Sequence, residues 1–187
     1  QRHSVKTRIA VLHGFDDCFT VFAGEVARLG KERNAESRVV ENVSLGGLGA
    51  AVIEQCGDWL KVGSLLGMQP EGGENWVLGV VRRFSKSSER SDSRENREVQ
   101  ASVGIQSLSR QAQGVELRPR TSGIAVMNAI PGIWLREGNA PGEARLVLPS
   151  GSFDLRESLE FSHDERNYLL TPIALEESGS DYEIARY

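Results

Sequence analysis

The chain has few of the residues that metal sites and disulfide frameworks need, with two cysteines and three histidines among 187 residues. Cys18 and Cys56 form no Cys-x-x-Cys pair, so we expect free thiols in a reducing compartment. None of the histidines lies in a zinc-protease pattern, and no nucleophile elbow is present. Glycine signatures of the Walker and Rossmann types are also absent. The sequence therefore shows no catalytic constellation, and we expect a protein that is not an enzyme.

One group of polar residues has the types of side chain that bind metals. His13 stands close to Asp16 and Asp17 in the sequence, and imidazole and carboxylate groups are common metal ligands. A histidine followed by two acids in a turn is more often a set of solvated side chains, and we favour that interpretation. We therefore expect no metal and no cofactor.

The chain also lacks a membrane-spanning run and a surplus of positive charge. It has no apolar stretch of about eighteen residues and no signal-peptide pattern, so we expect a cytoplasmic protein. A net charge of −4 argues against binding of a nucleic-acid polymer, which needs a basic face. The N-terminal arm differs, because Arg2, Lys6 and Arg8 are basic and no acid lies among the first ten residues. This arm can grip a small anion.

Alternating and β-branched runs dominate the chain and predict an all-β protein. Apolar residues make up 39% of it, which is enough for packed cores, and twenty glycines separate the runs at turn-like intervals. Only Phe22–Lys31 and Ile53–Lys61 show a short helix-like repeat. The strand-like runs are Ser37–Glu41, Leu48–Ile53, Leu65–Met68, Trp76–Phe84, Val99–Leu108, Ile124–Met127, Ile133–Arg136, Ala144–Leu148, Asn167–Leu170 and Tyr182–Ala185.

Two breaks in composition suggest how the chain is divided. Residues 85–98 contain no apolar side chain before Val99 and cannot bury surface, so we expect a solvated hairpin loop. A linker or an RNA-binding segment is the alternative, but flanking strands and nearly balanced charges argue against both. The strand-like pattern of apolar residues is interrupted a second time around Arg110–Gly114. We predict a β-barrel over residues 1–110 and a second mainly β domain over residues 115–187.

The second domain contains aromatic residues but no functional motif. We expect these side chains to lie in the core or on strand faces, and a ligand-binding platform is the minority alternative. They are Trp134, Phe153, Phe161, Tyr168 and Tyr182.

The most distinctive segment of the chain is Asn42-Val-Ser-Leu-Gly-Gly-Leu-Gly49. Asn42 and Ser44 offer short hydrogen-bonding side chains at alternating positions, and Gly46 and Gly47 permit close approach of a ligand or another chain. Taken alone, such a segment is also typical of an ordinary glycine-rich β-turn. Its position between two strand-like runs and after a basic arm adds weight to a functional interpretation.

The arm and this segment together resemble the PilZ domain, a bacterial receptor module for cyclic di-GMP. That family has an Arg-x-x-x-Arg arm before a β-barrel and an (Asp/Asn)-x-Ser-x-x-Gly turn within it. Asn42, Ser44 and Gly47 fill the turn pattern. Arg2 fills the first position of the arm, and Lys6 stands at the second. The resemblance covers about residues 1–110.

The resemblance implies a PilZ-like antiparallel barrel that binds cyclic di-GMP and couples binding to a change in domain arrangement or to a protein partner. The residues that it implies for ligand contact are Arg2, Lys6, Asn42, Ser44, Gly46 and Gly47. Lysine at position 6 keeps the charge but lacks the planar, two-pronged contact that arginine makes with guanine. A degenerate PilZ domain that serves as a protein-interaction module without nucleotide is the alternative.

Overall fold

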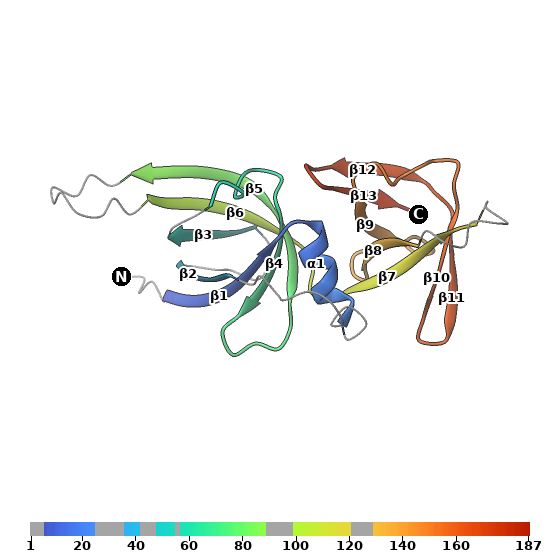
Figure 1. The fold of residues 1–187 in the computed structure, drawn as a ribbon, viewed down its shortest axis with the longest axis horizontal. Helices are drawn as coiled ribbons and strands as arrows, with labels where there is room; N and C mark the ends of the chain where they lie inside the picture. Colours follow the sequence, from blue (N-terminus) through green and yellow to red (C-terminus); the bar gives the residue numbers. More distant parts are fainter. Residues whose placement is uncertain (1–5, 25–35, 42–47, 55–56, 89–98, 121–128) are drawn as a thin grey trace. The chain divides into compact units, whose positions relative to one another are not determined.

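The computed structural model describes residues 6–24, 36–41, 48–54, 57–88, 99–120 and 129–187. Thirteen strands and one helix lie in these residues, and all the strand pairs are antiparallel, which confirms the predicted all-β class. The chain folds into two compact units (Figure 1). One unit comprises Gln1–His13 and Arg33–Arg110, and the other Gly14–Glu32 and Gln111–Tyr187.

The first unit is a ring of six strands. They are β1 (Lys6–His13), β2 (Glu36–Glu41), β3 (Leu48–Glu54), β4 (Leu65–Pro70), β5 (Val77–Ser88) and β6 (Val99–Ser109). Pairing runs in the order β1-β2-β3-β6-β5-β4, and β4 pairs again with β1, so the ring is closed. Inward side chains such as Val11, Leu66, Val81 and Val103 form its apolar core.

The loop predicted over residues 85–98 is shorter than expected. Ser85–Ser88 continue β5 and pair with Val99–Ser102 of β6, so the two strands form one long hairpin. Backbone hydrogen bonds to β6 support these polar residues as a strand although their side chains offer little to bury. Residues 89–98 lie outside the described part of the chain.

The second unit contains a seven-stranded sheet in the order β11-β10-β7-β8-β9-β13-β12. Its strands are β7 (Ala112–Pro119), β8 (Ile130–Leu135), β9 (Arg145–Pro149), β10 (Leu159–His163), β11 (Arg166–Leu170), β12 (Ala174–Ser178) and β13 (Tyr182–Arg186). Phe161 and Tyr182 are buried, and Trp134, Phe153 and Tyr168 pack partly buried against the core, as the sequence predicted. The run Ile124–Met127 lies outside the described residues.

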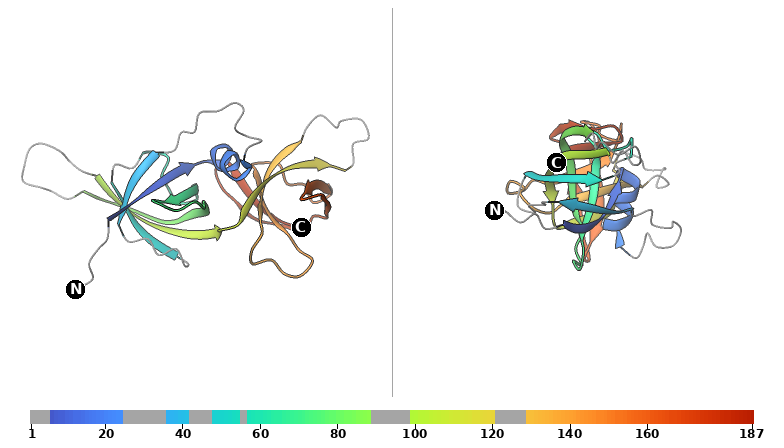
Figure 2. Two further views of the ribbon diagram at one scale, coloured as in Figure 1. Left: turned by 90° about the horizontal axis from the view of Figure 1, so that it is seen from below. Right: turned by 90° about the vertical axis from the view of Figure 1, so that its left-hand side faces the viewer.

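The helix α1 (Phe15–Phe22) belongs to the second unit, although the chain reaches it directly from β1. It lies against β7 and β8 (Figure 1 and Figure 2). Phe15, Cys18 and Phe22 are buried, and their spacing places them on one face of the helix. The predicted division of the chain at residue 110 is therefore wrong for Gly14–Glu32, which the apolar face of α1 joins to the second unit.

Two contacts fix α1 on the sheet. Gly114 of β7 allows the close approach, because a Cβ atom there would lie 2.5 Å from Ala23 Cα. At the other end of the helix, the N-cap residue Gly14 provides no side-chain acceptor. The Phe15 N–H instead donates a hydrogen bond of 2.8 Å to Asp181 Oδ2, from the turn between β12 and β13. The cap is thus supplied by the C-terminal end of the chain.

The described residues of Ile53–Lys61, one of the two segments with a helix-like repeat, contain no helix. Ile53 and Glu54 are the last residues of β3, and residues 57–63 form turns. Phe22 is the last residue of α1, and most of Phe22–Lys31 lies outside the described residues. The helix that the structure describes begins at Phe15, and only Gly14 separates it from β1, so no local side chain caps it.

We expect Asp181→Ala to lower the free energy of unfolding of the second unit by about 1 kcal/mol, the usual cost of removing a side-chain cap. Asp181→Asn is the matched control, because an amide oxygen can still accept the bond from Phe15 N–H. Urea unfolding followed by circular dichroism measures both variants. An equal loss in both would show that the hydrogen bond to α1 is not the source of the stabilisation.

The turn between β10 and β11 carries backbone strain. It consists of Asp164 and Glu165, with φ angles of 49° and 60°, so both residues are left-handed. Such a two-residue turn is of type I′, which matches the twist of a hairpin but favours glycine at the second position. A side chain in this region costs about 1–2 kcal/mol, and glutamate gains no local hydrogen bond there as aspartate can.

We expect Glu165→Gly to raise the midpoint of thermal unfolding, with a net gain of about 0.5–1 kcal/mol after the added freedom of the unfolded chain is subtracted. Glu165→Gln removes the charge and keeps the Cβ atom, so it should leave the midpoint unchanged. If the glutamine variant were stabilised as much as the glycine variant, charge rather than backbone strain would be the cause.

Candidate functional site

Of the six residues predicted to contact cyclic di-GMP, Lys6 alone lies in the described part of the chain. Those outside it are Arg2, Asn42, Ser44, Gly46 and Gly47. Lys6 is the first residue of β1 and pairs with Glu41, the last residue of β2. Because Asn42 follows Glu41 in the sequence, the register brings the end of the basic arm and the start of the glycine-rich segment to adjacent strands.

The other end of the glycine-rich segment is also fixed by register. Glu41 pairs with Val52 of β3, whereas β3 begins at Leu48, opposite Gln106 of β6. The part of β3 from Leu48 to Ala51 therefore extends past the end of β2 along β6. Residues 42–47 connect Glu41 to this extension, so both flanks of the segment belong to the β2-β3-β6 wall of the barrel (Figure 1).

The neighbouring strand β5 contains a bulge that the sequence reading missed. Its register against β6 shifts between Val81 and Arg83. Val81 lies in the barrel core and Phe84 packs against that core, so both point inward. Arg82 and Arg83 stand between them, and the bulge turns both to the outer face. Regular alternation would have placed one of the two arginines inside the barrel.

Both arginines contact residues of the neighbouring strand β6. Arg82 Nε donates a hydrogen bond of 2.7 Å to Gln106 Oε1, which orients the guanidinium. Arg83 is exposed, and a Cβ atom on Gly104 would lie 3.1 Å from Arg83 Cβ. Gly104 pairs on its other side with Ala50 of β3. The aliphatic part of the Arg83 side chain therefore lies over Gly104, and the missing Cβ atom makes room for it.

The second unit has an open groove of about 680 Å³ between α1 and the strands β7, β10 and β11. Glu116, Arg118 and Glu160 line it together with the apolar side chains of Phe19 and Leu169. The acids and the arginine carry mixed charge, and no nucleophile with an adjacent base stands among the described lining residues. The groove has the size of a ligand site but not the convergent polar groups that would define its ligand.

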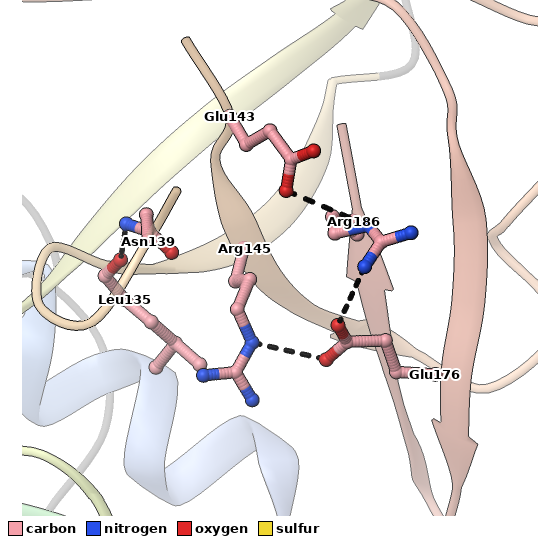
Figure 3. Close-up of polar contacts among 6 residues, drawn as sticks. All are labelled: Leu135, Asn139, Glu143, Arg145, Glu176 and Arg186. Atoms are coloured by element: carbon pink, nitrogen blue, oxygen red, sulfur yellow. Dashed lines mark hydrogen bonds and ion pairs between the residues drawn. The ribbon is translucent and has the colours of Figure 1, made fainter. Parts of the chain in front are cut away.

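A second polar cluster of this unit lies at the β12 edge of the sheet (Figure 3). Glu176 Oε2 accepts a hydrogen bond of 3.0 Å from Arg145 Nε, and Glu176 Oε1 lies 3.9 Å from Arg186 Nη1. Glu143 Oε2 is 3.6 Å from Arg186 Nε. Two acids thus balance two arginines, and they join β12 to β9 and β13. The charges of this cluster neutralise one another, so its role is to hold the edge strand in place.

The histidine considered as a metal ligand has a different role. The ring of His13 stacks on Trp59 of the same unit, with centroids 4.2 Å apart and an angle of 3° between the planes. Asp16 and Asp17 lie in the first turn of α1, where acids are favourable to the helix dipole. Across the described ranges, no three His, Cys, Asp or Glu residues are grouped to hold a metal ion. The thiol of Cys18 is buried.

A scan against protein-family models, a search of curated proteins and a search of solved structures each found no match to this chain. Within the portion of the chain that the structure describes, no helix is long and apolar enough to cross a membrane.

Proposed function

We propose that the protein is a cytoplasmic, non-enzymatic receptor for cyclic di-GMP. The pairing of Lys6 with Glu41 carries this proposal, because it joins the two sequence motifs. Each motif is short and is a weak signal when taken alone. The pairing of Lys6 with Glu41 supports a ligand that would contact the arm on one side and the Asn-x-Ser-x-x-Gly segment on the other.

The chemistry of the ligand matches the residue types of the two motifs. Cyclic di-GMP presents two phosphates and two guanines, so its receptor needs positive charge and donors directed at guanine O6 and N7. Arg2 can bind a guanine edge with its planar fork, and Lys6 can neutralise a phosphate. Asn42 and Ser44 offer short hydrogen-bonding groups, and Gly47 gives the backbone clearance.

The path of the chain supports coupling between ligand binding and the second unit. The strand β1 begins at Lys6, next to the arm, and ends at His13. Gly14 follows, and α1 is then held on the second unit by Gly114 and Asp181. A ligand that binds the arm better in one arrangement of the units shifts the population toward that arrangement. The nucleotide would act through β1 on the helix that follows it.

A protein-interaction module without nucleotide is the second candidate function. The observation that favours it is Lys6 at the position where the resemblance calls for arginine. Loss of the two-pronged guanine contact weakens the case for a nucleotide, whereas it leaves the barrel and the second unit intact as binding surfaces. The two candidates differ in one measurable property, the affinity for cyclic di-GMP.

Calorimetric titration of the full chain with cyclic di-GMP should give saturable heat, and the nucleotide should raise the midpoint of thermal unfolding. Ser44→Ala should bind more weakly with an unchanged circular dichroism spectrum, because a small hydroxyl is lost from the site. The absence of both heat and thermal stabilisation at high nucleotide would contradict the receptor function and favour the interaction module.

Substitutions in the arm test whether the motif or general charge binds the ligand. Arg2→Ala should weaken binding more than Arg8→Ala, since Arg8 lies outside the arm pattern and is exposed on β1. Lys6→Arg should tighten binding, by about 1–3 kcal/mol at most, because it restores a bidentate contact with guanine. Equal losses at Arg2 and Arg8 would indicate that charge alone matters. A Lys6→Arg variant that binds no better would place Lys6 outside the site.

A further inference from the structure

The open groove of the second unit lies at a place where two neighbouring strands of the sheet separate. The strands β7 and β10 pair over two residues each, and their ladder ends at Arg118 and Glu160. The hairpin partners β10 and β11, by comparison, pair over five residues each. Beyond the end of the β7-β10 ladder, Glu116 of β7 and Ser162 of β10 both line the groove, which has a volume of about 680 Å³. The groove therefore takes the place of the strand pairs that are missing.

The backbone groups of Glu116 and Ser162 are directed into this groove. At the paired end, the Arg120 N–H donates a hydrogen bond of 2.9 Å to the Ser158 carbonyl, so these two residues bond across the strands. In an antiparallel pair, every second residue directs its N–H and C=O to the same side of its strand. Glu116 is four positions before Arg120 and Ser162 is four positions after Ser158, so regular pairing would join them. The described strands do not form this pair, which leaves both residues with backbone groups that face the groove.

Two apolar side chains line the groove beside these backbone groups. Phe19 comes from α1, and Leu169 of β11 is 52% exposed. A strand that paired with β10 along the groove would bring every second side chain to the face on which these apolar groups lie. Peptide recognition by strand addition combines backbone hydrogen bonds, which give affinity, with pockets for alternate side chains, which give specificity. The groove offers both.

The charges around the groove favour a basic occupant. Glu116, Glu160 and Arg118 are the charged residues among its described lining. Glu160 Oε1 lies 3.5 Å from Arg120 Nε, whereas Glu116 forms no ion pair within the described residues. Residues 111–187 as a whole contain twelve acidic and seven basic residues. A segment that carries lysine or arginine is therefore complementary to this part of the protein.

We propose that the groove is a docking site for an extended segment of a partner protein, in which apolar and basic residues alternate and which pairs with β10 as an additional strand. The N–H and C=O groups of Ser162 bond to the backbone of the segment. Its apolar side chains contact Phe19 and Leu169, and its basic side chains neutralise Glu116. All of these residues belong to the second unit, so docking does not depend on nucleotide binding by the barrel.

A small molecule and a second copy of the chain are less complementary to the groove. The polar side chains of the lining do not converge on one point, as they do at a small-molecule site. The backbone groups that face the groove are instead matched by another extended backbone. A second copy carries the same surplus of acidic residues, and like charges oppose its association.

Fluorescence anisotropy of a labelled peptide of alternating lysine and valine, titrated with the full chain, measures docking, and the wild-type chain should bind it saturably. Ser162→Pro removes the N–H that faces the groove and leaves the ladder to β11 intact, so it should weaken binding about tenfold. Ser162→Ala is the matched control. It removes the hydroxyl that bonds to Asn167 but keeps the backbone N–H, so it should bind within about twofold of wild type.

A second peptide separates backbone pairing from attraction by charge. It has the same sequence with methylated backbone nitrogens, so it keeps the lysines and loses its hydrogen-bond donors. The wild-type chain should bind it about tenfold more weakly than the unmodified peptide. Circular dichroism checks that each variant is folded, and the comparison of the two peptides on wild type decides the question if Ser162→Pro does not fold.

Four results would overturn the docking site. Wild type that does not bind the unmodified peptide is the first, and Ser162→Pro that binds as tightly as Ser162→Ala is the second. Equal affinity for the methylated and unmodified peptides is the third, because charge alone would then explain the binding. The fourth is a wild-type dimer in analytical ultracentrifugation that Ser162→Pro abolishes, since the occupant of the groove would then be a second copy of the chain.

Discussion

The strand β1 connects the main features of this protein, because it pairs with β2 on one side and with β4 on the other and so closes the ring. A sheet that closes on itself has no free edge, and its registers are fixed by one another. Closure therefore sets the opposition of Lys6 and Glu41 rather than leaving it to a flexible terminus. The same strand ends at His13, one residue before the chain enters the second unit.

The helix α1 shows why local sequence could not predict the division of the chain. Its buried residues Phe15, Cys18 and Phe22 have helical spacing, but a segment of eight residues, five of them aromatic or β-branched, is a weak helix signal. The two determinants that fix it, Gly114 and Asp181, lie in the second half of the sequence. Because the capping side chain of Asp181 lies so far along the chain, the sequence next to the helix gives no sign of it. Tertiary contacts, rather than intrinsic helix propensity, determine that Phe15–Phe22 form a helix.

Nine of the thirteen described strands coincide with predicted runs, whereas β1, β7, β10 and β12 were not predicted. Most strand-like runs became strands, since alternation directly reports which face is buried. The polar stretch Ser85–Ser88 was assigned to a loop because it has nothing to bury, yet its backbone pairs with β6. The two motifs of the candidate site were identified from the sequence. The structure adds the pairing of Lys6 with Glu41. Five of the six named residues lie outside the described part, so their roles remain proposals.

The bulge in β5 has a cause that can be read in the sequence once the barrel is known. Val81 and Phe84 are three positions apart, and a regular strand sends such residues to opposite faces. Both are apolar and both pack in or against the core, so burial of the pair requires one extra residue between them. The cost is an interrupted ladder, and burial of the Phe84 ring offsets it. The residues between are then forced outward together, whatever their identity. The barrel requires only that these two side chains be polar, and Arg82 meets that requirement with its hydrogen bond to Gln106.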